Sequence, residues 1–418
     1  MVKPIHLWLL TLAMTAIGLP TMADNSGRIS GTIRTVDGDT FKGLIRWDKN
    51  EGSWVDILDG TRDRDKREHS SRSTRRKYSS RRSSVKLFGL DLSTGPDNYG
   101  FVFEGSASES GIRFGHLRSL EVTDDDRALL ILKSGEEIEL YNGSTDIGTS
   151  IREILIEDVN EGEVEFSWED IELIEFSDAG SGKPSVFGER LYGTVSTRRG
   201  DEFTGFICWD VDELFEEDIL DGEDRRRSRK VPFGRISSIS RYSSSGAEVA
   251  MKAGDTVLLR GSNDVDEGNR GIIVCDPAFG QVSVGWGEFE KLEFKTAPRA
   301  VRYADFDGGR KLKGTVYTED GEKFSGEICW DDDEVYSWEL LNGNYRDMEF
   351  KIEMGLIKQI EKNSGRSSDV TVSDGRVFRL RGSNDVDEDN KGIIVTAADG
   401  DEEYIDWEEF SRVVFDNK

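Results

Sequence analysis

The chain has 418 residues, and its 83 acidic residues outnumber 55 basic ones, for a net charge of −28. Such a surface repels nucleic acid and anionic lipid headgroups and attracts cations, so we expect no intracellular nucleic-acid partner. Hydrophobic residues make up 36% of the chain, which is typical of a folding sequence and not of a disordered acidic tail.

The N-terminus has the features of an export signal. Lys3 supplies a positive charge, residues 7–19 form a largely apolar run, and Ala23 closes a small-residue cleavage site. We therefore predict a signal peptide over residues 1–23, forming an N-terminal signal helix, and a periplasmic or secreted protein. The apolar run is short for a bilayer span, and we expect no transmembrane segment after signal cleavage.

A seven-residue sequence that occurs twice reveals internal repeats. Gly-Ser-Asn-Asp-Val-Asp-Glu stands at 261–267 and again at 382–388, and each copy runs on into Gly-Ile-Ile-Val. The match extends over whole units, because the flanking segments also correspond. The predicted organisation is repeat 1 at 28–176, a linker at 177–190, repeat 2 at 191–294, a linker at 295–311 and repeat 3 at 312–415.

Every repeat has the pattern of strands and turns. Short segments rich in Val, Ile, Phe and Trp alternate with Gly, Asp and Asn, which predicts an all-β fold. Each repeat divides into two halves: the first contains a Trp-Asp pair, as at Trp209, and the second contains the loop that follows Arg260. We expect about five strands in each half.

The first half resembles a known class of small barrels. Residues 205–210, Gly-Phe-Ile-Cys-Trp-Asp, are similar to the strand pattern of SH3-like and Sm-like barrels, although the N-terminal helix and Arg-Gly signature of Sm proteins are not in the expected places. The resemblance implies a tandem array of small barrels, three repeats of two half-units each, and little about function. As a whole, the array resembles exported bacterial tandem-repeat proteins of unknown function.

The duplicated loop is a candidate metal site. Clustered carboxylate and amide oxygens are ligands that Ca²⁺ prefers, although the spacing does not fit an EF-hand. The candidate ligands are Asn263, Asp264, Asp266, Asn384, Asp385 and Asp387. The alternative, which we favour, is a turn in which these side chains cap local backbone amides. No other cofactor is expected.

A second acidic segment follows each Trp-Asp pair. It contains Asp210, Asp212 and Glu213 in repeat 2 and residues 331–334 in repeat 3. A solvated hairpin end is the favoured interpretation. If both acidic loops face the same end of a repeat, they form a shared cation site, which the sequence does not decide.

Tryptophans recur at strand ends, where they are most often core residues, and a carbohydrate-stacking platform is the alternative. Trp54 and Trp338 are less regular, so we expect them to be exposed and to contact a ligand.

Repeat 1 also contains a basic insertion, at about 61–84, which we expect to be disordered. It offsets the acidic bulk or docks an anionic polymer, and the candidate binding residues are Arg72, Arg75, Arg76, Lys77, Arg81 and Arg82. A shorter basic run occupies residues 225–230 of repeat 2.

Catalytic signals are sparse. The odd number of cysteines, Cys208, Cys275 and Cys329, argues against a disulfide framework, and a pair between the first two is the open alternative. No nucleophile elbow, zinc-spaced cluster or phosphate-binding loop is present. We therefore predict a non-enzymatic binding or structural module of the cell envelope, in multivalent contact with a protein or polysaccharide. The alternatives are a carboxylate-based glycan hydrolase and a Ca²⁺-dependent binding protein.

Overall fold

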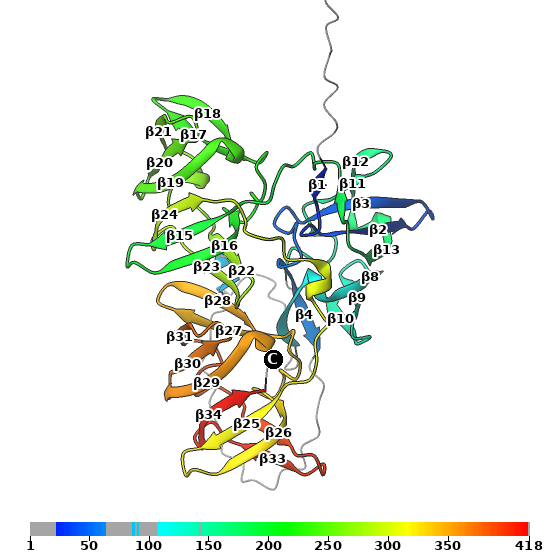
Figure 1. Ribbon diagram of the computed structural model, residues 1–418, viewed down its shortest axis with the longest axis vertical. Helices are drawn as coiled ribbons and strands as arrows, with labels where there is room; N and C mark the ends of the chain where they lie inside the picture. Colours follow the sequence, from blue (N-terminus) through cyan, green and yellow to red (C-terminus); the bar gives the residue numbers. More distant parts are fainter. Residues whose placement is uncertain (1–21, 64–85, 88–89, 92–106, 142–143, 417–418) are drawn as a thin grey trace, which may run out of the picture.

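The computed structural model describes residues 22–63, 86–87, 90–91, 107–141 and 144–416 (Figure 1). This part of the chain consists of antiparallel strands and single-turn 3₁₀ helices, so the all-β prediction is confirmed. Nearly all of the predicted signal peptide, and most of the predicted basic insertion, lie outside the described residues. In the described ranges, no helix is long and apolar enough to cross a membrane.

The strands and 3₁₀ helices of repeat 1 and its flanks are β1 (Ala23–Asp24), β2 (Ser30–Thr35), β3 (Thr40–Trp47), β4 (Ile57–Asp63), β5 (Lys86–Leu87), β6 (Leu90–Asp91), β7 (Ala107–Arg113), η1 (Phe114–His116), β8 (Leu117–Asp124), β9 (Arg127–Leu132), β10 (Glu137–Tyr141), β11 (Ile154–Asp158), β12 (Gly162–Phe166), η2 (Trp168–Asp170), β13 (Ile171–Phe176) and β14 (Ser181–Gly182).

Repeat 2 and the linker after it contain β15 (Tyr192–Thr197), β16 (Glu202–Trp209), β17 (Ile219–Asp224), β18 (Arg227–Pro232), η3 (Phe233–Arg235), β19 (Ile236–Ser243), β20 (Gly246–Met251), β21 (Thr256–Leu259), η4 (Asn263–Val265), β22 (Ile272–Asp276), β23 (Gly280–Val284), β24 (Phe289–Phe294) and η5 (Tyr303–Asp305). Repeat 3 contains β25 (Lys313–Thr318), β26 (Lys323–Cys329), β27 (Leu340–Tyr345), β28 (Met348–Glu353), η6 (Met354–Leu356), β29 (Ile357–Ser364), β30 (Ser367–Val372), β31 (Val377–Leu380), β32 (Ile393–Thr396), β33 (Glu402–Ile405) and β34 (Phe410–Phe415).

The three repeats share one spatial order of strands. Repeat 1 runs β7-β4-β10-β9-β8-β13-β2-β3-β11-β12. Repeat 2 follows the same order from β21 to β23, and its β17–β18 hairpin lies beside β21. Repeat 3 follows it from β31 to β33, and its β27–β28 hairpin lies beside β31. We call β7, β18 and β28 the start strands of the repeats, and β12, β23 and β33 the end strands.

The two predicted halves of a repeat are interleaved in this order. The first-half strand β15 lies between β16 and β24, the last strand of the second half. The expected division of each repeat into two independent barrels therefore does not hold. Hydrophobic periodicity locates strands but does not say which strands pair. Here the first and last strands of each repeat pair with each other in the middle of the strand order.

The recurring Gly-Thr-Val motif has a steric cause in this central pairing. A Cβ atom on Gly31 would lie 2.3 Å from the carbonyl oxygen of Glu175, and one on Gly193 would lie 2.5 Å from that of Glu293. Gly314 is placed in the same way, 2.3 Å from the carbonyl oxygen of Val414. Only glycine allows the last strand of the repeat to approach so closely.

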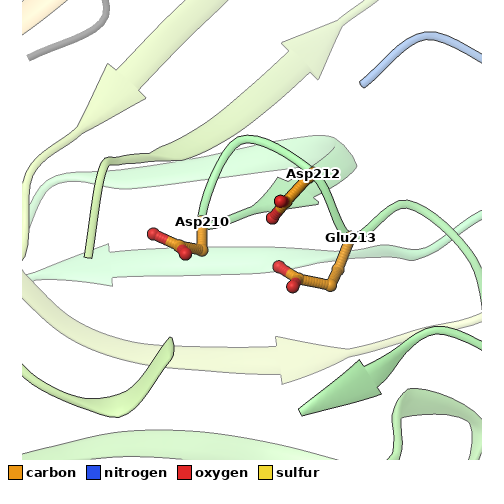
Figure 2. A group of neighbouring side chains, drawn as sticks. All are labelled: Asp210, Asp212 and Glu213. Carbon is orange, nitrogen blue, oxygen red and sulfur yellow. The ribbon is translucent and has the colours of Figure 1, made fainter. Parts of the chain in front are cut away.

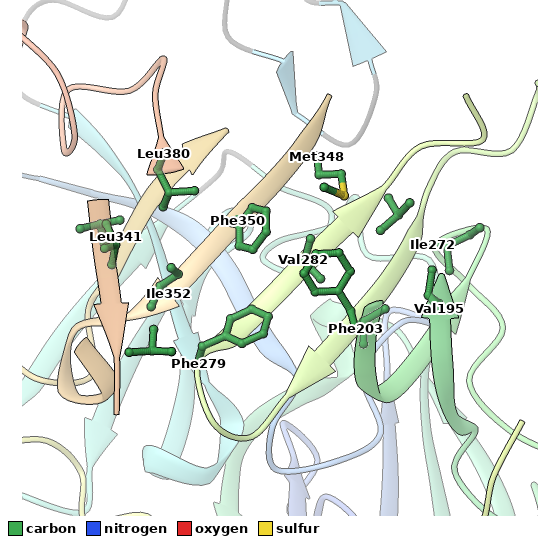
Figure 3. Packing of buried hydrophobic residues seen from close by; sticks show 14 of the residues in the cluster. Val195, Phe203, Ile272, Phe279, Val282, Leu341, Met348, Phe350, Ile352 and Leu380 are labelled. Atoms are coloured by element: carbon green, nitrogen blue, oxygen red, sulfur yellow. The ribbon is translucent and has the colours of Figure 1, made fainter. Parts of the chain in front are cut away.

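Repeats 2 and 3 are joined by a continuous β-ladder. End strand β23 pairs with start strand β28, so that Val282 lies opposite Phe350 and Val284 opposite Met348. All four side chains are buried and belong to a hydrophobic cluster that runs through both repeats (Figure 3). In Figure 1 the two repeats form one column, with β18 near its upper end and β33 near its lower end.

Repeat 1 lies beside this column and contacts it through side chains (Figure 1). Arg190 Nη2 lies 3.0 Å from Asp56 Oδ1, with both side chains buried, and Lys351 Nζ lies 2.7 Å from Asp59 Oδ1. The ladder seen between repeats 2 and 3 is not repeated here, because β12 is the outer strand of its sheet and β18 pairs only with β17 among the described strands.

Candidate functional site

The duplicated loop connects two parts of each repeat through hydrogen bonds. In repeat 2, Trp209 Nε1 donates to the carbonyl oxygen of Asp264 at 2.9 Å, and the amide of Asp221 donates to Asp264 Oδ2 at 2.6 Å. Ser262 Oγ in turn accepts from the amide of Asp264 at 3.1 Å. Repeat 3 has the first two of these bonds around Asp385, from Trp330 Nε1 and from the amide of Asn342. The favoured interpretation, side chains that cap local backbone amides, describes this loop only in part, because Asp264 accepts from an amide of the distant strand β17.

The divergent repeat 1 has the corresponding hydrogen bonds. Trp47 Nε1 donates to the carbonyl oxygen of Asp146 at 3.0 Å, and the amide of Asp59 donates to Asp146 Oδ2 at 2.7 Å. Thr145 donates to Asp48, just as Asn263 donates to Asp210 in repeat 2. Repeat 1 has Thr145 and Gly148 where repeat 2 has Asn263 and Asp266, but it keeps the carboxylate of Asp146 that makes these bonds.

The two acidic segments converge, which the sequence left open. Carboxylate oxygens of Asp331, Glu334 and Asp385 lie within 4.8 Å of one another, although they come from both loops. In repeat 2 the corresponding group consists of Asp210, Asp212 and Glu213, which lie along the turn after β16 (Figure 2).

Of the other predicted ligands, Asn263 and Asn384 contact these groups as hydrogen-bond donors. Asp266 and Asp387 do not belong to them. Asp266 accepts from the amide of Gly268 at 2.9 Å, and Asp387 accepts from the amide of Asp389 at 3.1 Å. The structure thus brings together a different set of oxygens from the one that the sequence suggested.

A basic side chain lies close to the clustered acidic residues of each repeat. Arg270 Nη2 lies 2.9 Å from Asp210 Oδ2 and 2.6 Å from Asp212 Oδ1, and Arg152 Nη2 lies 3.0 Å from Asp48 Oδ2. In repeat 3, Lys391 Nζ is more distant, at 3.9 Å from Asp331 Oδ2. The sequence signal was the basic residue that precedes Gly-Ile-Ile-Val in repeats 2 and 3, and Glu-Ile-Leu-Ile in repeat 1. If a cation binds at any of these groups, repeat 3 offers it the weakest competitor.

Burial changes the charge of these groups. Burial, with Asp212 and Asp264 nearby, raises the pKa of Glu213 to about 11, and burial likewise raises the pKa of Glu334 well above its ordinary value. Burial also raises the pKa of Asp264 to about 6. These shifts favour the protonated form of the glutamic acids, which limits the negative charge that a cation would meet.

Trp54 and Trp338 are not exposed, so this prediction is wrong. Trp54 is fully buried: its Nε1 donates to the carbonyl oxygen of Ser26 at 3.0 Å, and its ring lies 4.5 Å from that of Tyr303 in the second linker. Trp338 is 1% exposed, and its ring lies under the guanidinium of Arg62. Their irregular placement in the sequence reflects contacts between repeats and not contacts with a ligand.

The other predicted sites have simpler outcomes. The candidate binding residues of the basic insertion, from Arg72 to Arg82, lie outside the described residues. Cys208, Cys275 and Cys329 are free and buried, so the open alternative of a disulfide between the first two is wrong. They are small buried side chains, as is most common for free cysteines.

A groove of about 420 Å³ lies where repeats 2 and 3 meet. Sequence reasoning missed it, because its lining comes from five separate strands and turns. The lining residues are Asp201, Glu202, Phe203, Tyr345, Asp369, Val377, Phe378 and Arg379. Aromatic rings and charged side chains thus line the same groove, a composition that suits a small ligand or one unit of a polymer.

Aromatic packing makes the groove rigid. The ring of Phe378 lies 4.9 Å from that of Phe350 and 5.3 Å from that of Phe279, which belong to the cluster beneath. Tyr345 is half-buried and lies 4.6 Å below the guanidinium of Arg346.

Three of the four charged side chains that line the groove, Asp201, Asp369 and Arg379, are in ion pairs. Arg379 holds Asp369 with two hydrogen bonds, of 2.7 and 2.9 Å, and Arg346 pairs with Asp201. The side chain of Arg379 is 58% exposed, so its remaining donors are accessible. The groove therefore offers hydrogen-bond donors and acceptors beside aromatic rings, without a strong net charge.

Comparisons of the chain with models of protein families, with curated protein sequences and with solved structures find no match.

Proposed function

We propose that the protein is an exported, non-enzymatic binding and structural module of the cell envelope, and that the groove between repeats 2 and 3 holds a polysaccharide. The observation that carries this proposal is the groove itself, which is lined by aromatic rings together with charged side chains that are mostly paired. A sugar ring has apolar C–H faces and a rim of hydroxyl groups. Aromatic rings bind the faces, and carboxylate and guanidinium groups bind the hydroxyls.

The paired charges favour a neutral polysaccharide over an anionic polymer. Asp369 and Asp201 each have an arginine partner, so the groove attracts neither sign of charge strongly. The remainder of the chain carries an excess of acidic residues, which repels a polyanion at long range.

The test measures binding of the purified protein to a panel of neutral and anionic envelope polysaccharides by calorimetry. We expect Tyr345→Ala to weaken binding of a neutral polysaccharide about tenfold, equivalent to ~1.4 kcal/mol for a lost stacking contact. Tyr242→Ala is the matched control, because Tyr242 is 59% exposed and lies outside the groove lining.

Equal affinity of the wild type and Tyr345→Ala for every polysaccharide would contradict the groove assignment. The same samples are assayed for new reducing ends. Their steady release, lost in Asp369→Asn, would instead support the glycan hydrolase.

A further inference from the structure

We propose that the free ends of the column bind each other: end strand β33 of one molecule pairs with start strand β18 of a second copy, which gives a head-to-tail chain. The molecule already contains the template for this contact. End strand β23 of repeat 2 pairs with start strand β28 of repeat 3 over five residue pairs, from Gly280↔Ile352 to Val284↔Met348.

Both partner strands present an edge for pairing. β33 is the outermost strand of the repeat 3 sheet, and β18 has β17 as its single strand partner in the described part of the chain. They lie near opposite ends of the column in Figure 1, so one molecule can use both at once. An interface between two different surfaces that does not close on itself produces an open chain.

The sequences of the two strands are complementary in charge. Placed in the register of β23 and β28, Glu403 of β33 takes the place of Val282, and Arg229 of β18 takes the place of Phe350. Glu402 likewise comes to lie opposite Lys230. The apolar pair Val282–Phe350 and the polar pair Gln281–Lys351 of the internal ladder are thus replaced by two pairs of opposite charge. Such pairs stabilise neighbouring strands when they lie directly opposite.

The same charges disfavour other pairings. Two β33 strands, or two β18 strands, would bring like charges together, as on natural edge strands that avoid self-association. The acidic edge of β12 is a weaker partner for β18, because the template register sets Val164, and not a carboxylate, opposite Arg229. These features select β33 with β18.

The free strands are exposed and only lightly engaged. Residues Glu402, Glu403, Arg229 and Lys230 are all exposed. Arg229 contacts Asp224 at 3.3 Å and Lys230 contacts Asp221 at 3.7 Å, in ion pairs at the surface that contribute little stability. Because the new contact is short and charged, we expect weak association that high salt suppresses.

The test follows the oligomeric state of the purified protein by sedimentation velocity over a range of concentrations at low salt. We expect a concentration-dependent series of species. The double variants Glu402→Lys/Glu403→Lys and Arg229→Glu/Lys230→Glu should each associate about tenfold or more weakly, because two attractive pairs become repulsive.

Mixing the two double variants is the matched control for folding. Each then supplies the strand that the other lacks, so an equimolar mixture should assemble like the wild type. A wild type that stays monomeric at every concentration, or variants that associate as the wild type does, would overturn the proposal.

The register is tested by cysteine pairs. Glu403→Cys with Arg229→Cys should yield disulfide-linked oligomers, whereas Glu403→Cys with Ser228→Cys should not, because neighbouring residues of a strand face opposite sides. If Val164→Cys with Arg229→Cys instead yields a crosslinked monomer, β12 of the same chain pairs with the free edge of β18, and the proposal fails.

Discussion

The contact between repeats 2 and 3 differs in kind from the contacts that hold repeat 1. Between repeats 2 and 3, backbone pairing of β23 with β28 carries buried apolar side chains on one face. Repeat 1 has no such ladder to the column in the described residues, and it docks through side chains. These include charged pairs such as Lys351–Asp59 and buried apolar residues such as Trp338. One plan of strands thus supports two kinds of interface, because the sequence of the start and end strands differs between repeats.

The physical consequence is a difference in how each interface responds to substitution and to pH. Apolar contacts contribute in proportion to the area that they bury and are insensitive to pH. A buried charged pair contributes little net free energy when intact, yet the loss of one partner is costly. The following predictions test that difference.

The largest effect is expected from Phe350→Ala, at the centre of the ladder. Phe350 is 1% exposed and contacts Phe203, Phe279 and Phe378, so its truncation leaves a cavity. We expect a loss of about 3–5 kcal/mol in the free energy of unfolding, measured by chemical denaturation. Val159→Ala, at a residue that is 66% exposed, is the control and should change stability by less than about 0.5 kcal/mol. A similar loss in both would contradict the account.

A somewhat smaller effect is expected from Lys351→Met, which leaves the carboxylate of Asp59 buried without its cation. Asp59 is 4% exposed, so we expect a loss of about 3 kcal/mol by the same measurement. The double variant Lys351→Met/Asp59→Leu should recover most of that loss, because no charge is then left buried. If the double variant is as unstable as the single one, an unpaired buried charge is not the cause of the lost stability.

The pH response should depend on Glu353, which joins repeat 3 to Arg113 and His116 of repeat 1. Burial alone would raise the pKa of Glu353, but Arg113 and His116 lower it below its ordinary value of 4.5. A lowered pKa in the folded state stabilises the fold above about pH 4.5, and this contribution is lost as the pH falls through the folded pKa.

Glu353→Gln should therefore lose about 1–2 kcal/mol relative to the wild type at pH 7, and the difference should shrink toward pH 3. Denaturation curves at several pH values measure it. A difference that stays constant with pH would show that Glu353 is not held by Arg113 and His116.

The smallest effect is expected from calcium, whose binding to this protein stays a prediction. If Asp331, Glu334 and Asp385 bind Ca²⁺, about 1 mM of the ion should raise the melting temperature by ~2 °C relative to chelator, and Asp331→Asn should abolish the shift. Asp399→Asn, at an exposed position in the turn before β33, is the control. Equal melting temperatures with ion and with chelator would exclude the site.

The sequence predicted the strands well but not their partners. The Gly-Thr-Val motif and the Trp-Asp pairs mark strands because alternation and turn residues are local signals. The pairing of β15 with β24 is not local, since about a hundred residues separate Gly193 from Phe294. For that reason the two halves of a repeat looked separable.

The site residues show the same limit. Identity between two copies drew attention to Asp266 and Asp387, which cap local turns, while the carboxylates that converge come from both loops. Trp54 and Trp338 looked exposed because they break the repeat pattern. Residues that break a repeat pattern also serve contacts between repeats, and only the packing against Tyr303 and Arg62 shows which role applies.

Hydrogen–deuterium exchange of the dilute protein tests the difference between the interfaces most directly. We predict that amides of β23 and β28 exchange as slowly as those of the central strand β15, because they are paired on both sides. The outward-facing amides of β12 and β18 should exchange much faster. Equal protection of β12, β18, β23 and β28 would contradict the account, since repeat 1 would then be joined to repeat 2 by the same ladder.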